Sequence, residues 1–355
     1  MSHPSCRVKH AGESDRAAWD AYVRKHAHGS LFHLFGWADV MRGAYGHAAY
    51  FLMLLSGERV LGVLPVVHLR HAIFGNGLVS LPFLDGGGIL ADGREAEESL
   101  LSEVVRLGKR VGAQYIELRH ERALETCGST SPHAVMTRSH KVRMLLRLPA
   151  SAEMLLKSFK SKLRSQINKA LKEEFTTRVG GLELLEDFYK VFLVNMRDLG
   201  SPVHSVKLMR HALLAFPEHA RIIVVYRSTE PVAAALVIGF RNVLRNPWAS
   251  SLRKYASLGP NMLLYLRMLE HACDHGYEVF DFGRSSPGEG TYRFKEQWGA
   301  VPQPLYWHYL SLDGRMPDLE DTGKARFETA MRCWQRLPLI LTRIIGPRIR
   351  KHISL

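Results

Sequence analysis

The helices and strands that the sequence predicts occur in the same order twice. In the first half, apolar periodicity predicts helical segments, a β-hairpin, an amphipathic helix and a strand, at 14–47, 48–69, 95–112 and 115–118. In the second half the same order is predicted for helices, strands, a helix and a final strand, at 152–173, 184–199, 221–226, 232–240, 262–275 and 277–282. A repeated element order predicts two copies of one α+β unit.

A chain of 355 residues is long enough for two domains with separate cores. We expect a first domain over 1–150, which ends with a Ser/Thr/Pro/Gly-rich loop at Thr126–His140 and a strand at Met144–Leu148. We expect a second domain over 151–312 and a basic, amphipathic tail over 313–355. Each domain is predicted to hold a mixed, mostly antiparallel sheet flanked by helices.

Charge and cysteine content limit the partners and the chemistry. The net charge of +14 favours an anionic partner. The four cysteines are far apart and no His or Cys array has metal-ligand spacing, so we expect neither a disulfide framework nor a metal site. The polar N-terminus is unlike a signal peptide, and no stretch reaches the ~20 apolar residues of a membrane span. We therefore expect a cytoplasmic protein.

Gly259–Trp298 holds the strongest candidates for a site. Asn261 is expected to cap a helix whose N-terminus could bind phosphate or carboxylate. The strand expected over 277–282 ends in Asp281-Phe282-Gly283, and a Gly-rich loop leads from it to an aromatic and basic turn. Functional groups often gather on such loops. The basic and aromatic candidates there are Arg284, Tyr292, Arg293 and Lys295. The alternatives are a capped core helix and a solvated basic loop.

This segment resembles the C-terminal core of FemAB-related proteins, which have the GNAT (N-acetyltransferase) superfold. The resemblance lies in GPNMLLYLRMLEHACDHGYEVFDFG and GTYRFKEQWGA, and upstream in SLFHLFGWADVMRGAYGHAAYFL and FGNGLVSLPFLDGGG. The tail WQRLPLILTRIIGPRI is similar to the branch found with exosortase and exopolysaccharide gene clusters, the PEP-CTERM systems. The resemblance spans most of the chain.

The resemblance implies two tandem GNAT-like domains and transfer of an acyl or aminoacyl group. It implies that Lys295 binds or polarises the donor ester. It also implies an anionic donor, either a CoA thioester or an aminoacyl-tRNA, and no tightly bound cofactor. Two features depart from the family. Pro260 removes one N–H from the place of the CoA pyrophosphate loop, and the long helical arm thought to meet tRNA is absent.

Further candidates lie outside this segment. On the basic helix over 152–173, Lys162 and Arg164 could bind a diphosphate, and a solvated helix face is the alternative. His33 and Trp37 could line an acceptor pocket near a Gly-rich turn, where Asp85 could take up a proton, although His33 and Trp37 are also typical core residues. Tyr255 is another candidate pocket residue, and Asp281 or Asp85 is a candidate for positioning the acceptor.

These patterns lead to competing hypotheses. The first is a transferase that moves an acyl or aminoacyl group by direct attack onto a nucleotide- or lipid-linked precursor of the cell envelope or of an exopolysaccharide. No Ser-His-Asp or Cys-His pattern predicts a covalent intermediate. The second is a non-catalytic, degenerate GNAT pair that binds a polysaccharide or lipid-linked sugar. A nucleic-acid-binding role is third, because no recognition motif is present. The apolar and cationic tail could contact the inner membrane, or pack on its own domain.

Overall fold

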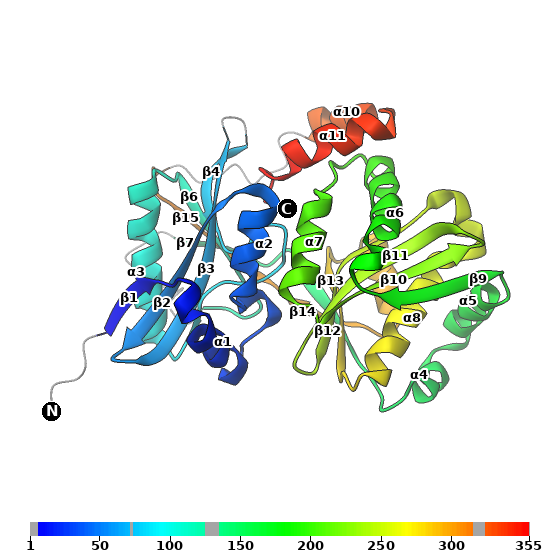
Figure 1. The fold of residues 1–355 in the computed structure, drawn as a ribbon, viewed down its shortest axis with the longest axis horizontal. Coiled ribbons are helices and arrows are strands. Elements are labelled where there is room, and N and C mark those ends of the chain that lie inside the picture. Colours follow the sequence, from blue (N-terminus) through cyan, green and yellow to red (C-terminus); the bar gives the residue numbers. More distant parts are fainter. Residues whose placement is uncertain (1–5, 72–73, 125–134, 315–323, 355) are drawn as a thin grey trace. The chain divides into compact units, whose positions relative to one another are not determined.

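The computed structural model describes residues 6–71, 74–124, 135–314 and 324–354. The chain forms two compact units, and each is built around its own sheet (Figure 1). Unit 1 comprises 1–141, 304–320 and 352–355, and unit 2 comprises 142–303 and 321–351. Both units are α+β with mixed, mostly antiparallel sheets, as the repeated element order predicts.

Unit 1 has an eight-stranded sheet. Its path is β1-β2-β3-β4-β6-β15-β7, and β5 pairs with β3. Its strands are β1 (Cys6–His10), β2 (Ala48–Ser56), β3 (Arg59–His71), β4 (Gly75–Val79), β5 (Leu90–Ala91), β6 (Tyr115–His120), β7 (Val135–Arg138) and β15 (Tyr306–Ser311). Its helices are η1 (Glu13–Asp15), α1 (Arg16–Lys25), η2 (Leu31–His33), α2 (Gly36–Tyr45) and α3 (Arg94–Val111).

The hairpin and the long helix of unit 1 follow directly from the sequence. β2 and β3 pair antiparallel around the turn that begins at Ser56, as predicted. The apolar stripe of α3, including Leu100, Val104 and Leu107, is buried in a cluster with residues of β2, β3, β4 and β6. This core therefore lies between α3 and one face of the sheet.

Unit 2 has a seven-stranded sheet with the order β14-β8-β13-β12-β11-β10-β9. Its strands are β8 (Val142–Arg147), β9 (Phe175–Gly180), β10 (Ala220–Arg227), β11 (Glu230–Phe240), β12 (Val243–Ser251), β13 (Val279–Ser285) and β14 (Val301–Pro304). Its helices are α4 (Ala152–Ser158), α5 (Ser161–Leu171), η3 (Leu182–Leu184), α6 (Leu185–Asp198), α7 (Val206–Ala215), η4 (Arg253–Leu258), α8 (Pro260–Asp274), α9 (Gly290–Gln297), α10 (Lys324–Gln335) and α11 (Leu339–Arg350).

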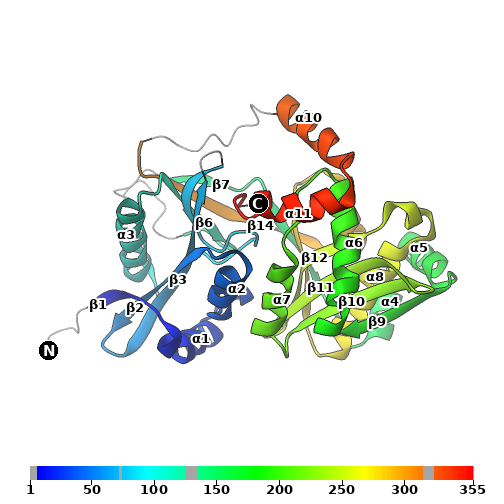
Figure 2. The same ribbon diagram turned by 45° about the horizontal axis from the view of Figure 1, so that its top comes forward.

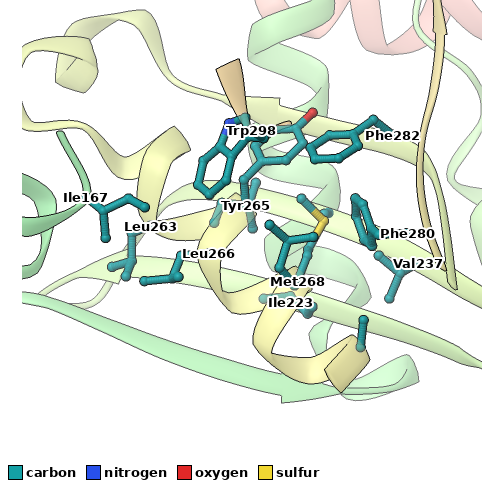
Figure 3. Packing of buried hydrophobic residues seen from close by; sticks show 14 of the residues in the cluster. Ile167, Ile223, Val237, Leu263, Tyr265, Leu266, Met268, Phe280, Phe282 and Trp298 are labelled. Carbon is teal, nitrogen blue, oxygen red and sulfur yellow. The ribbon is translucent and has the colours of Figure 1, made fainter. Parts of the chain in front are cut away.

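Helices cover both faces of the sheet in unit 2. On one face, α5 and α8 bury Ile167, Leu263 and Met268 against Ile223 and Val237 of the sheet (Figure 3). The other face is covered by α6, which contacts β10, β11 and β12. Because both faces are covered, β11 is apolar and almost continuously buried instead of alternating.

Several local predictions are wrong. The helix expected over 152–173 is two helices, α4 and α5, which are separated by extended backbone at Phe159 and Lys160. The expected loop Thr126–His140 contains strand β7 in its last part, while 125–134, with Cys127, lies outside the described residues.

The expected boundaries 1–150 and 151–312 also differ from the units. β8 pairs with β13 and so belongs to the second sheet, whereas β15 pairs with β6 and β7 and so belongs to the first. The expected tail over 313–355 is divided too, because α10 and α11 belong to unit 2 and 352–355 to unit 1.

Candidate active site

Two neighbouring strands at the centre of unit 2 stop pairing halfway along their length. β12 and β13 are parallel and pair only through Val243–Arg245 and Val279–Asp281. Beyond these pairs β12 remains bonded to β11 up to Ser251, while β13 remains bonded to β8 up to Ser285. The sheet therefore has a gap between the ends of β12 and β13, and Gly283 (φ +75°) lies where the register of β13 shifts.

A buried ion pair closes the base of this gap. The Asp281 carboxylate accepts a hydrogen bond from Arg245 Nη1 at 2.7 Å, and Arg143 Nη1 lies 3.8 Å from the same oxygen. The second Asp281 oxygen accepts the Gly283 N–H at 2.9 Å. Asp281 thus binds residues of its own sheet, an arrangement that favours a structural role for this carboxylate over positioning an acceptor.

Lys295 projects from α9 to the end of β13 and is buried. Its Nζ donates hydrogen bonds to the carbonyl oxygens of Gly283 (3.0 Å) and Arg284 (2.8 Å). An ammonium buried without paired acceptors would be costly, and the two carbonyls offset that cost. The predicted aromatic and basic turn is in fact the helix α9, which places this positive charge against the carbonyl oxygens of β13, beyond the residues of β13 that pair with β12.

Aromatic rings of α8 and β13 pack together in the buried core of unit 2 (Figure 3). Tyr265 of α8 stacks on Phe282 of β13 with 5.5 Å between ring centroids, and its ring also contacts Phe294 (4.9 Å) and Trp298 (6.0 Å). Burial raises the pKa of the Tyr265 hydroxyl to about 12, and the Asn246 side chain opposes that rise by a hydrogen bond. Tyr265 is therefore neutral at physiological pH.

Buried polar atoms on these elements lack partners among the described residues. They are Asn246 Oδ1 on β12, Ser285 Oγ on β13 and Trp298 Nε1 after α9. Buried polar atoms are nearly always hydrogen-bonded, so each such atom calls for a ligand or water. Asn246 and Trp298 were not among the candidate site residues predicted from the sequence. The sequence signal for Asn246 is a polar run, Arg245-Asn246, inside an otherwise apolar and aromatic segment.

The N-terminus of α8 offers few N–H groups. Gly259 (φ +78°), not Asn261, is the N-cap, so the predicted cap is wrong. A Cβ at Gly259 would lie 3.3 Å from Ala170 Cβ, so glycine serves both the left-handed backbone and the close approach of α5. Pro260 has no N–H, and the N–H groups of Met262 and Leu263 both bond to the Gly259 carbonyl. Asn261 occupies the second helical position and is half-buried.

Three more predicted residues lie in η4, in α9 and near the end of β13. Tyr255, in η4, donates its hydroxyl to Glu230 at 2.5 Å, and Lys254 Nζ lies 4.8 Å from its ring centroid. Tyr292 packs half-buried against the core of unit 2, and Arg284 is half-buried at the end of β13.

The exposed face of α5 forms a shallow polar hollow. Arg164 lines it, but Lys162 does not; the other lining residues are Ser161, Ser165, Asn168, Lys169 and Lys172. Hydroxyl, amide and cationic groups at this helical spacing suit a phosphate ligand.

The candidates of the first domain lie in unit 1. Trp37 is fully buried and donates its indole N–H to the Leu31 carbonyl, which is the core role named as the alternative. His33 is also buried, with Nδ1 at 3.0 Å from Ser30 Oγ. Asp85 is half-buried in the loop before the Gly-rich turn, and the Phe32 ring packs directly on Gly86. The structure thus brings η2 to this turn but places Trp37 in the core.

Unit 1 has a corresponding parallel strand pair, β4 and β6. Other residues of the chain occupy the space beyond the last paired residues of these two strands. The pairing ends at Val79 and Glu117. Beyond it, the fully buried Arg119 donates to Glu117, to the Leu84 carbonyl and to Ser354 Oγ. The Ser354 carbonyl also accepts the Phe83 N–H at 2.7 Å. C-terminal residues of the chain therefore occupy this part of unit 1.

A family model described as an acetyltransferase (GNAT) domain matches 157–296. These residues contain α5, the strand gap and Lys295. No curated protein matches the chain.

Solved structures show the same tandem fold. FemX matches with a TM-score of 0.63 at 15% identity, covering 85% of this chain and 96% of that one. The C-terminal domain of a putative lysylphosphatidylglycerol synthetase from Agrobacterium fabrum matches with a TM-score of 0.57 at 11% identity, covering 83% of this chain and 91% of that one. A tandem GNAT protein from the clavulanic acid biosynthesis pathway matches with a TM-score of 0.56 at 10% identity, covering 88% of this chain and 99% of that one. The predicted pair of GNAT-like domains is confirmed.

Proposed function

We propose that this chain transfers an acyl or aminoacyl group to an amine or hydroxyl of a cell-envelope or exopolysaccharide precursor. The observation that carries the proposal is the strand gap between β12 and β13, because the buried Lys295 ammonium, the buried polar atoms of Asn246 and Ser285, and the Phe282–Tyr265 ring pair all lie on these two strands or bond to them. The titles of two structural neighbours, FemX and a putative lysylphosphatidylglycerol synthetase, are consistent with envelope chemistry.

The donor is proposed to lie in the gap of unit 2 and not in unit 1. Unit 1 supports this assignment because Arg119 and Ser354 fill the space beyond its own parallel strand pair. In the gap, the donor carbonyl would lie near Lys295, whose charge stabilises the oxyanion that forms on attack. The acceptor nitrogen or oxygen attacks the carbonyl carbon directly, the bond to the donor's oxygen or sulfur breaks, and the leaving group takes up a proton.

The phosphates of the donor are assigned to the α5 hollow instead of the α8 N-terminus. Arg164, Lys169 and Lys172 supply charge there, whereas the first turn of α8 retains at most the Asn261 N–H. This favours a CoA thioester or an aminoacyl-tRNA held mainly by side chains. Because both donors are made in the cytoplasm, the reaction is proposed to occur there.

Donor binding and turnover test the proposal. Acetyl-CoA, a longer acyl-CoA and aminoacyl-tRNA are each added in a thermal unfolding series, with UDP-sugars as the comparison. A true donor at 100 times its Kd should raise the unfolding midpoint by about 5 °C. Stabilisation by UDP-sugars or glycans alone would favour the non-catalytic binding protein.

With the donor known, Lys295→Ala should lower kcat at least about tenfold, because charge stabilisation in the transition state is lost. Lys157→Ala, which removes an exposed lysine of α4, is the matched control. A folded Lys295→Ala variant with normal turnover would remove Lys295 from the mechanism.

A further inference from the structure

Helix α11 carries a row of apolar side chains on its outer face. Ile340 is 67% exposed, Ile344 is 49% exposed, and Leu341 and Ile345 are also exposed. Isoleucine and leucine exposed side by side on one helix form a patch, which differs from the single apolar residues common on protein surfaces.

The opposite face of α11 is fixed to unit 2, so the apolar row cannot turn inward. α11 lies along α6 (Figure 2). Thr342 is buried, and a Cβ at Gly346 would come within 3.0 Å of Val203, so the helix packs there at backbone distance. Arg350 Nε also lies 3.1 Å from His204 Nε2. One face of α11 therefore packs on its own unit, while its outer face stays exposed.

Positive charge surrounds the apolar row. Residues 334–354 contain five Lys and Arg and no Asp or Glu. Arg336, Arg343 and Arg348 are exposed, and Arg348 bonds to the Ile344 carbonyl of its own helix. No helix in the described ranges is long and apolar enough to cross a bilayer. An apolar row with a cationic border and no acidic residue matches an anionic lipid surface, where apolar side chains enter the acyl region and arginines meet phosphates.

We infer that α11 docks this protein on anionic phospholipid membranes, with Ile340, Leu341, Ile344 and Ile345 inserted at the interface. This contact is a property of α11 alone. It needs neither donor nor acceptor, and it stands or falls independently of the proposed transferase activity.

Vesicle binding by the full chain tests the inference. Co-sedimentation is measured with vesicles of phosphatidylcholine alone and with vesicles in which a molar fraction of about 0.3 is phosphatidylglycerol. The phosphatidylglycerol gives the second kind of vesicle a negative surface. The unchanged chain should bind the anionic vesicles at least about tenfold more tightly than the phosphatidylcholine vesicles. Raising NaCl to about 0.5 M should weaken binding to the anionic vesicles, because at roughly 0.1 M salt the Debye length is already only about 10 Å and it shortens further as salt is added. No binding to anionic vesicles would overturn the inference.

A matched pair of variants identifies the surface. Ile340→Glu with Ile344→Glu should weaken binding to anionic vesicles at least about tenfold. The control, Leu214→Glu with Val301→Glu, replaces equally exposed apolar residues by the same charges elsewhere and should stay within about twofold of the unchanged chain. The assignment to α11 would be overturned if both variants lost vesicle binding equally, or if Ile340→Glu with Ile344→Glu lost none.

Two further measurements exclude other causes. Thermal unfolding midpoints should agree among all three chains, because every substituted side chain is exposed. Sedimentation velocity should show the same oligomeric state for the unchanged chain and for Ile340→Glu with Ile344→Glu. A dimer that becomes monomeric only in this variant would show that the row contacts a second copy of the chain, and the membrane assignment would be wrong.

Discussion

The Asp281 carboxylate lies between two guanidinium groups in the interior of unit 2, with Arg245 at 2.7 Å and Arg143 at 3.8 Å. Asp281 was a candidate because it lies in Asp281-Phe282-Gly283 at the end of a predicted strand. The sequence could not show that arginines of β12 and β8 reach the same carboxylate, because strand order is a long-range property. The same limit concealed Asn246, whose partner Tyr265 comes from α8.

We predict that Asp281→Asn destabilises unit 2. The neutral amide leaves Arg245 buried without a counter-charge, which should lower the free energy of unfolding by about 3 kcal/mol. Urea unfolding measures the change. Asp281→Leu with Arg245→Met should recover part of the loss, because the pair is removed together. An Asp281→Asn chain with unchanged stability and lost turnover would instead indicate a catalytic role.

His308 should make stability depend on pH. Burial lowers its pKa to about 4, whereas the unfolded chain has a value near 6.5. The unfolded state therefore takes up a proton first as pH falls, so stability is complete above about pH 6.5 and is lost toward pH 4. The contribution of His308 between pH 7.5 and 5 is about 2 kcal/mol. His308→Gln should reduce the difference in unfolding free energy between these pH values, while exposed His28→Gln should not.

Among the helices and strands, those with a regular apolar face were predicted from the sequence, whereas strands with polar residues were not. The β2–β3 hairpin, α3, α6 and α8 lie close to their expected ranges, because each buries one regular apolar face. β12 was missed because its sequence, VLRNPWASS, contains arginine, asparagine and proline. Arg245 pairs there with Asp281 of β13, a partner that the local sequence does not reveal.

Helix α7 was also missed, although its N-terminus carries a signal. The Ser205 hydroxyl accepts the Lys207 N–H at 3.2 Å, and apolar residues follow at helical spacing. We predict that Ser205→Ala lowers the free energy of unfolding by about 1 kcal/mol, while Ser205→Asp keeps most of it. Denaturant titration of both variants measures this. Equal losses would show that the hydroxyl acts elsewhere than at the cap.

For the whole molecule, the repeated element order correctly predicts two α+β units, but not where each one ends. The linear division at 150 and 312 fails because β8 and β15 each pair within the sheet of the other expected domain. Exchange of a strand between sequence halves leaves no mark in composition or periodicity. Only the hydrogen-bonded neighbours of β15, on β6 and β7, reveal it.

We predict that a fragment of 1–150 does not form the fold of unit 1. It lacks β15, which lies between β6 and β7, and it carries β8 without the sheet to which β8 belongs. Circular dichroism and amide exchange should show little protection in β6 and β7. A peptide of 304–314 added in trans should increase protection in those strands. A stably folded 1–150 fragment would contradict this prediction.

The position of β15 has a consequence for synthesis. The ribosome makes β7 by residue 138 and reaches β15 only at 306, an interval of 168 residues. At bacterial and eukaryotic elongation rates this interval lasts roughly 10–30 s. During that time β6 presents an unpaired edge, the kind of surface on which chaperones act and aggregation begins. The first unit to be started is thus the last to be completed, and the nascent chain must be protected until the second unit has emerged.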